Sequence, residues 1–271
     1  MVANGATNWA YDVSPSFPAT VFWNAIIPKN LLDTFNENNC YYSFNDVIQV
    51  KNPPICDVTW ARINELAEDL NWYDLYRPVY DGGLGSGHNL ESENSRLGSA
   101  MVDGELKTYK KGMTMSEYTP WAHSLLHQSN HRLGDYTTDY MNTEEMRNAL
   151  NIPSDVQAWE MCSDKLDYHS FDEASFWIYP ILRGKYRMLF FSGDTDGAVP
   201  TYGSRQWIND LDWNITEAWR PWFTNGQVSG YVEKHDGLDF VTVKGVGHMA
   251  PQWARQPVTD MITSWIHGQD F

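Results

Sequence analysis

The chain has 271 residues, with 19 Lys and Arg against 35 Asp and Glu, so its formal net charge is −16 and its pI is near 4.7. Apolar residues make up 42% and aromatic residues 14%, which is ample for a packed core and excludes global disorder. An acidic chain without a basic face is unsuited to nucleic acid or an anionic membrane, so neither is an expected partner. No run of about 18 apolar residues occurs, so no membrane-spanning segment is expected.

The first third of the chain predicts helices. Apolar residues form a broad face along residues 16–38, but Pro28 should interrupt a helix there, so a helical hairpin is expected. Further on, Asp57 is suited to cap a second helical element that runs to about Leu70.

The middle of the chain changes in composition. Residues 81–112 are rich in Gly, Ser, Asn and charged residues, which predicts an exposed, flexible loop. A helix is expected from Asn142 to about Leu150, because Glu145 follows Asn142 by three residues in the arrangement of a capping box.

The last third predicts an α/β sheet. Residues 187–191 form an apolar run that ends in a polar turn, which is typical of a buried strand, and a helix should follow at 202–211. Residues 227–234 and 238–244 predict two strands of a hairpin, and residues 251–267 a final helix. This order is that of the closing half of a doubly wound sheet.

Asp196 and His248 each follow the end of a predicted strand, so both should emerge at the same edge of the sheet. A carboxylate that accepts the Nδ1 proton of an imidazole fixes its tautomer and stabilises the imidazolium formed in nucleophilic catalysis. Their order along the chain is the one required of the second and third members of an α/β-hydrolase triad. Asp194, in the same turn as Asp196, suits a structural role better, and each residue taken alone is more often structural than catalytic.

Three cysteines leave one thiol without an internal partner. Cys40 and Cys56 bracket a polar loop and could form a disulfide. Cys162 would then be the unpaired cysteine. Three buried free thiols of a cytosolic protein are the alternative. Asn214 begins the single glycosylation sequon of the chain.

Two stretches surround the Asp and the His: Phe191-Ser-Gly-Asp-Thr-Asp-Gly-Ala-Val-Pro200 and Val243-Lys-Gly-Val-Gly-His-Met-Ala-Pro251. They resemble the Asp and His motifs of the serine carboxypeptidases, acid-acting exopeptidases of the α/β-hydrolase fold. The resemblance continues, in the same order as in that family, in further stretches that cover nearly the whole chain: Val2–Asn8, Asn71–Tyr76, Tyr140–Leu150 and Trp159–Asp164.

The resemblance implies roles for individual residues. Asp196 would be the orienting carboxylate and His248 the general base. Met249 would line the pocket for the substrate's C-terminal side chain, although ordinary core filling is its alternative. Cys40 with Cys56 matches a short-range bridge of the family, whereas the counterpart of Cys162 bridges to the N-terminal half.

The family's nucleophile lies in a Gly-Glu-Ser-Tyr-Ala-Gly elbow, and no serine of this sequence has that context. Ser86 lies in a glycine-rich stretch but does not follow an apolar strand. The chain therefore resembles the C-terminal portion of a carboxypeptidase, without a signal peptide of its own, and is expected to be inactive alone. A partial gene model, an expressed fragment and proteolytic processing remain open as the origin of the cut.

The resemblance also predicts organisation, partners and location. Residues 1–15 would end a core strand and turn, residues 16–139 would form a helical insertion or cap that contains the flexible loop, and residues 140–271 would complete the α/β-hydrolase core. The expected partners are a peptide with a free C-terminal carboxylate and the missing N-terminal half, and a homodimer remains open. The expected location is the secretory pathway, the lysosome or vacuole, or the extracellular space, with glycosylation at Asn214.

Three alternatives remain open. His123, His127 and His131 would share one face of a helix and could bind Zn²⁺, but no acidic ligand accompanies them, so neither a metal nor a cofactor is expected. A serine carboxypeptidase-like acyltransferase would use the same triad. A non-catalytic peptide- or sugar-binding protein would fit the missing serine and the 13 tryptophans.

Overall fold

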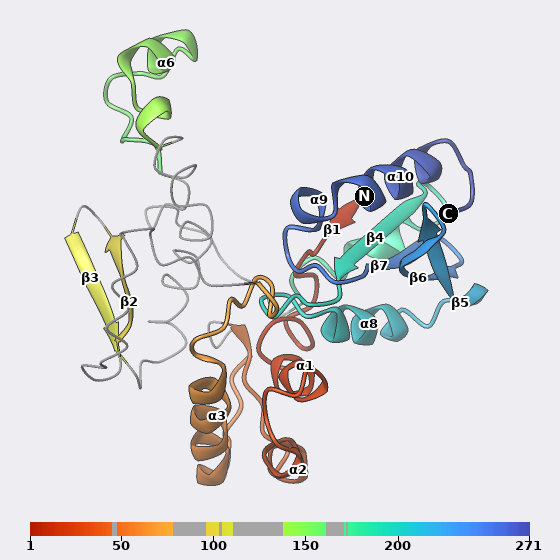
Figure 1. Cartoon of the computed structure of the whole chain (residues 1–271), viewed down its shortest axis with the longest axis horizontal. Coiled ribbons are helices and arrows are strands. Elements are labelled where there is room, and N and C mark those ends of the chain that lie inside the picture. Colours follow the sequence, from red (N-terminus) through yellow and green to blue (C-terminus); the bar gives the residue numbers. More distant parts are fainter. Residues whose placement is uncertain (45–47, 78–95, 103–104, 111–137, 161–170, 172) are drawn as a thin grey trace. The chain divides into compact units, whose positions relative to one another are not determined.

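A computed structural model of the chain (Figure 1) describes residues 1–44, 48–77, 96–102, 105–110, 138–160, 171 and 173–271. The chain falls into two compact units, residues 1–77 with 170–271 and residues 78–169. The expected three-part division at residues 15 and 139 stays a prediction. Within the described residues, no helix combines the length and the apolarity needed to cross a bilayer.

The first unit is built on a five-stranded sheet with the order β1-β4-β7-β6-β5. Strands β1, β4 and β7 are parallel, and β6 and β5 continue the sheet by antiparallel pairing. The strands span Val2–Ala3 (β1), Met188–Gly193 (β4), Ile215–Thr224 (β5), Gln227–His235 (β6) and Leu238–Val243 (β7). The predicted α/β fold is thus confirmed, and β4, β6 and β7 lie within a residue or two of their expected positions.

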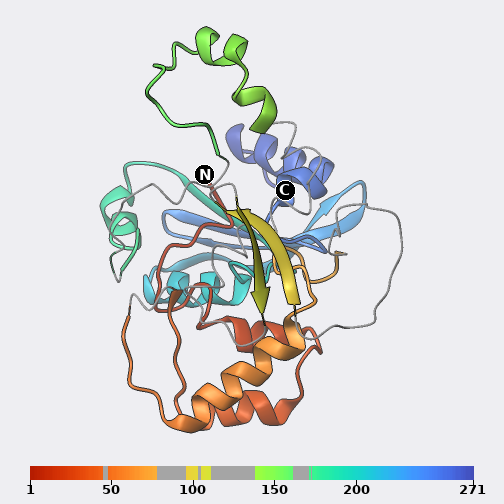
Figure 2. The same ribbon diagram turned by 90° about the vertical axis from the view of Figure 1, so that its left-hand side faces the viewer.

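Helices cover both faces of this sheet (Figures 1 and 2). On one face, α9 and α10 pack against Leu189 and Phe191, while Phe190 points to the opposite face, where α7 and α8 lie. The alternation follows from the period of two along a strand. These helices span Ile178–Leu182 (α7), Thr201–Asp210 (α8), Ala250–Trp253 (α9) and Arg255–Ile266 (α10).

A helical group lies on the α8 side of the sheet (Figure 2). It consists of α1 (Phe17–Trp23), α2 (Lys29–Glu37) and α3 (Pro54–Ala67). Pro28 directly precedes α2 in an extended conformation, which confirms the interruption expected there, since proline begins a helix more readily than it continues one. Trp60 of α3 is the centre of this group, because its ring contacts Phe17 and Phe35 and stacks on Tyr42.

Two expected helix caps are wrong by a few residues. The helix predicted to start at Asp57 starts at Pro54, because the Pro53-Pro54 pair sets the first turn, and the Asp57 carboxylate instead accepts the Tyr42 hydroxyl at 2.7 Å. Helix α6 (Glu144–Ala149) is capped by Thr143, whose side chain accepts the Met146 N–H. The side chain of Asn142, the expected cap, instead bonds the backbone of Trp159.

The second unit contains α6 and an antiparallel strand pair, β2 (Arg96–Val102) with β3 (Glu105–Lys110). This pair lies inside residues 81–112, where the composition predicts a flexible loop. The remaining residues of that loop lie outside the described part of the chain.

A disulfide joins Cys40 to Cys56, with 5.3 Å between the two Cα atoms. It ties the segment after α2 to the first turn of α3. Both side chains are buried. The sequence left open whether these two cysteines, 16 residues apart, form a disulfide, and the structure contains it.

Replacing both cysteines, Cys40→Ser with Cys56→Ser, should lower the free energy of unfolding by about 2–4 kcal/mol, because the bridge constrains the unfolded chain. Urea unfolding followed by circular dichroism measures this loss. Wild-type protein treated with reductant should unfold at the same urea concentration as the double variant. Equal midpoints for oxidised wild type and the double variant would contradict the prediction.

Candidate active site

Two loops meet at one edge of the sheet because their parent strands are parallel neighbours. β4 ends at Gly193 and β7 ends at Val243, and these two residues are paired in the register. Asp196 lies three residues beyond the first strand end and His248 five residues beyond the second. The rule that the carboxyl ends of parallel strands gather polar groups at one edge therefore applies to this pair.

The side chains of Asp196 and His248 are in direct contact, with 2.8 Å between Oδ2 and Nδ1. The Asp196 carboxylate is completely buried, and the His248 side chain is 27% exposed. The other carboxylate oxygen, Oδ1, accepts the N–H groups of Ala198 at 2.8 Å and Val199 at 3.0 Å. These two bonds fix the carboxylate so that Oδ2 faces the imidazole.

Asn4 is a further partner of Asp196. Its Nδ2 donates to Oδ2 at 2.8 Å, and its backbone N–H donates to the carbonyl of Phe191 in β4. Asn4 has a φ of 44°, a left-handed conformation that asparagine tolerates better than most residues. Sequence reasoning assigned it no role, although an Asn-Gly pair directly after a strand is a signal of such a turn.

The environment of His248 favours its charged form. Burial disfavours the imidazolium, but the charge on Asp196 and the hydrogen bond to it outweigh that effect, so the pKa of His248 is raised. Among the described residues, no partner contacts its Nε2, the nitrogen that would exchange a proton with a substrate or nucleophile. The pair can therefore act as an oriented base and, once protonated, as a stabilised acid.

The turn formed by residues 71–77, called here the 71–77 turn, holds both loops by their backbones. The N–H of Leu75 donates to Thr195, and the carbonyl of Trp72 accepts from Gly197. The carbonyl of Tyr73 accepts the N–H of His248 at 2.6 Å, and the Tyr73 ring meets the imidazole edge to face.

A glycine is required where this turn meets the His loop. A Cβ at Gly247 would lie 1.9 Å from the Tyr73 carbonyl oxygen, so no larger residue fits without moving the backbone.

The remaining predicted site residues lie as follows. Asp194 is exposed and accepts the N–H of Gly245 at 2.6 Å, which joins the two loops at the surface, as suits the structural role expected of it. Met249 is half-buried next to His248, and Asn214 is exposed just before β5. Their roles in substrate binding and glycosylation stay predictions. Cys162, Ser86 and the three histidines at 123, 127 and 131 lie outside the described residues.

A buried carboxyl, Asp12, lies behind this site. Its Oδ2 accepts the N–H groups of Thr7 at 2.6 Å and Asn8 at 2.9 Å. Burial is the main reason that its pKa is raised to about 7, and the charge of Asp196 adds to the effect. Sequence reasoning missed this residue as well.

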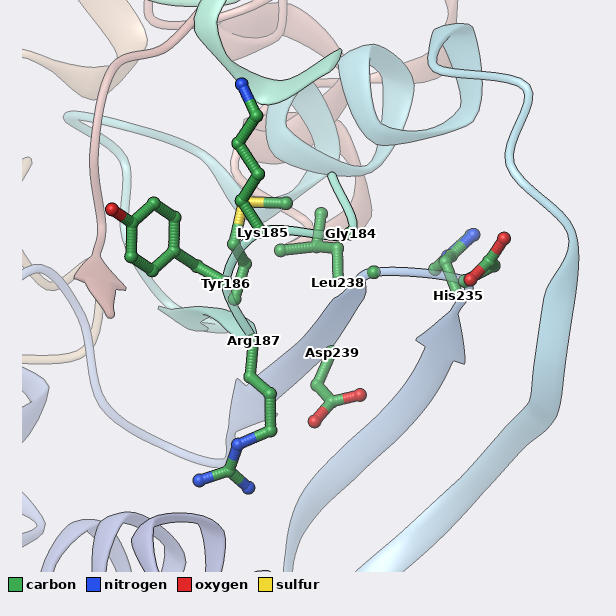
Figure 3. Close-up of a pocket in the computed structure, with 10 residues that line it drawn as sticks. Gly184, Lys185, Tyr186, Arg187, His235, Leu238 and Asp239 are labelled. Atoms are coloured by element: carbon green, nitrogen blue, oxygen red, sulfur yellow. The ribbon is translucent and has the colours of Figure 1, made fainter. Parts of the chain in front are cut away.

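A hollow of about 390 Å³ lies at the opposite edge of the sheet (Figure 3). Residues before β4 and around the β6–β7 turn line it, including Lys185, Tyr186 and His235. Two of its charged groups are engaged by α10: Arg187 donates to the carbonyls of Trp265 and Ile266, and Asp239 accepts the Trp265 indole N–H at 2.8 Å. The hollow is thus separate from the Asp196–His248 pair. Across the described part of the chain, no group of His, Cys, Asp and Glu is arranged to hold a metal ion.

The fold and the Asp196–His248 pair define a class, the α/β-hydrolases. Similarity to known proteins identifies the family. A family model described as serine carboxypeptidase matches residues 1–268, and the chain belongs to this family. Serine carboxypeptidase 1 of Hordeum vulgare is 30% identical over 236 residues, which are 79% of this chain and 46% of that protein. Serine carboxypeptidase-like 20 of Arabidopsis thaliana is 28% identical over 229 residues, again 79% and 46%.

A solved structure shares the fold. The structure of Kex1Δp, described as a prohormone-processing carboxypeptidase from Saccharomyces cerevisiae, has a TM-score of 0.55 and 17% identity and covers 98% of this chain and 53% of its own. The chain thus spans about half the length of the relatives it matches.

Substituting Asp196→Asn should lower the pKa of His248 below its ordinary value of 6.5, because the burial that opposes charging remains while the attracting charge is lost. The wild-type pair should stabilise the fold fully below the unfolded pKa and lose this contribution as the pH rises through the raised folded pKa. Histidine ¹⁵N NMR titration measures the pKa. The matched variant Asp194→Asn should leave it in place, and an equal drop in both variants would contradict the assignment.

Asp12 should make stability fall as the pH rises between 3.8 and about 7, since the folded state holds a proton there that the unfolded state releases. Asp12→Asn keeps an acceptor oxygen for Thr7 and Asn8 but carries no titrating proton. The difference in Tm between variant and wild type should therefore grow in favour of the variant across this range. Asp69→Asn changes an exposed carboxylate and is the matched control, and its Tm should follow that of the wild type across this pH range. If the Tm of Asp12→Asn ran parallel to that of the wild type, the effect of Asp12 on stability would be refuted.

Proposed function

We propose that the chain supplies the orienting carboxylate and the general base of a serine-type carboxypeptidase. The observation that carries the proposal is the 2.8 Å contact between Asp196 Oδ2 and His248 Nδ1 at the carboxyl edge of the sheet. Membership of the serine carboxypeptidase family supports it. The chain order, carboxylate before imidazole, also agrees with that of the α/β-hydrolases.

The reaction proceeds in two stages. In the first, the serine Oγ forms a bond to the scissile carbonyl carbon while its proton moves to Nε2 of His248, and Asp196 stabilises the imidazolium. The C–N bond then breaks as Nε2 returns the proton to the leaving amine. In the second, water takes the place of the amine and gives a proton to Nε2 of His248 as its oxygen bonds to the acyl carbon. The bond between the acyl carbon and the serine Oγ then breaks as Nε2 returns the proton to Oγ, which frees the acid product and the serine.

The substrate is a peptide with a free C-terminal carboxylate, and Met249, next to His248, lines the site for its terminal side chain. The nucleophile comes from polypeptide outside these 271 residues, which contain no Gly-x-Ser-x-Gly element. That polypeptide is the N-terminal half of the same enzyme, and without it the chain is inactive.

The enzyme acts in the secretory pathway, the lysosome or vacuole, or outside the cell. The Cys40–Cys56 disulfide supports an oxidising compartment, and the exposed position of Asn214 supports its glycosylation.

The function is tested on the protein expressed from its complete coding sequence. Diisopropyl fluorophosphate should label one serine, located by mass spectrometry, and peptides should lose residues from their C-terminal end. Absence of a labelled serine would sink the proposal and favour a binding protein. A labelled serine with acyl transfer from a sugar ester and no peptide hydrolysis would favour the acyltransferase.

In that protein, His248→Ala should lower kcat/KM by about 10³- to 10⁶-fold, and Asp196→Asn should be nearly as damaging. The neighbouring variant Asp194→Asn is the matched control, because it removes a carboxylate from the same turn without touching His248. It should lower Tm but retain kcat/KM within about tenfold. The reverse order of the two Asp variants would overturn the assignment of Asp196.

A further inference from the structure

A second buried carboxylate, Asp74, lies at the centre of the 71–77 turn and is 1% exposed. Its Oδ1 accepts the Thr195 hydroxyl at 2.8 Å, and its Oδ2 accepts the N–H of Gly247 at 3.2 Å. These two donors come from loops that lie 121 and 173 residues away along the chain. One side chain thus bridges the Asp loop and the His loop.

The two bridged residues are the immediate neighbours of the pair. Thr195 directly precedes Asp196, and Gly247 directly precedes His248. A shift of either neighbour therefore changes the distance or the angle between the carboxylate and the imidazole.

We propose that Asp74 is a positioning residue that sets the geometry of Asp196 and His248 through Thr195 and Gly247. The inference rests on the proposed function. Asp74 contacts neither member of the pair, so it acts through its neighbours rather than on the substrate.

An aspartate at position 74 suits this positioning role better than an asparagine would. Four donors converge on Asp74, because the N–H of Tyr76 also reaches Oδ1 and the Nε of Arg77 also reaches Oδ2. A carboxylate offers about four lone-pair sites and no donor. An asparagine that kept its oxygen toward Thr195 would turn its NH₂ group toward the N–H of Gly247, so two donors would face each other.

The backbone of the 71–77 turn also binds both loops, and the two loops bind each other through the N–H of Thr195 and the carbonyl of Val246. The bonds of the turn go to Thr195 and Gly197 on one loop and to His248 on the other. Asp74 adds a buried side-chain link between the two loops, at Thr195 and Gly247, whereas Asp194 joins them at the surface through the N–H of Gly245. A misplacement of about 1 Å at reacting groups costs on the order of 100-fold in rate.

The test uses Asp74→Asn and Asp74→Ala in the protein expressed from its complete coding sequence. We expect kcat to fall about 10- to 100-fold with KM within about twofold, because orientation of the pair matters to the chemical step more than to substrate binding. The rate of serine labelling by diisopropyl fluorophosphate, which needs no peptide binding, should fall by a similar factor. NMR titration should show a lowered pKa of His248 as its contact with Asp196 loosens.

The matched control is Asp239→Asn. Asp239 lies in β7, remote from the pair, and its partly buried carboxylate accepts the Trp265 indole N–H. This substitution should lower Tm but leave kcat, the labelling rate and the pKa of His248 in place. A purely structural role for Asp74 would give its variants this same pattern and would overturn the proposal.

The Thr195 variants decide the matter even if the Asp74 variants do not fold. Thr195→Val removes the hydroxyl that Asp74 binds, whereas Thr195→Ser keeps it, and we expect the valine variant to lose at least threefold more in kcat than the serine variant. Equal kcat values would contradict the bridge. If His248→Ala itself leaves activity intact, the proposed function fails first, and that outcome is distinct from a failure confined to Asp74 and Thr195.

Discussion

The complete burial of the Asp196 carboxylate is the constraint on which the site depends. A buried charge is tolerated only when hydrogen bonds or an opposite charge replace the water it loses. Here the two N–H groups of Ala198 and Val199, the amide of Asn4 and the imidazole of His248 fulfil that need. The same set of contacts therefore stabilises the buried carboxylate and orients the base. A change that weakens the stabilisation of Asp196 also alters the orientation of His248.

The charge at Asp196 also affects its surroundings in opposite directions. It raises the pKa of His248 by attraction and adds to the raised pKa of Asp12 by repulsion. A raised pKa of His248 means that the neutral, basic form declines as the medium becomes acidic. The raised pKa thus moves the range in which His248 is a neutral base toward higher pH.

The predictable parts of this fold are those with local signals. The apolar run at 187–191 and the turn residues after it locate β4 and its loop, and Pro28 separates α1 from α2. Strand β5 was missed, because it is an edge strand that contains Pro221 and alternates poorly. Asn4 and Asp74 could not be assigned roles from the sequence, since their partners lie 121 to 192 residues away and only the folded chain brings them together.

The helical group contributes to the site through a continuous series of contacts. The Cys40–Cys56 bridge holds α3, where Trp60 packs against Phe17 of α1. Phe17 in turn contacts the ring of Trp72, with 4.5 Å between ring centroids, and the Trp72 carbonyl binds the N–H that follows Asp196. Because interiors are close-packed, a loosened helical group transmits its displacement to the 71–77 turn. The disulfide is thus linked to the geometry of the Asp196–His248 pair as well as to stability, although it lies in a different layer of the fold.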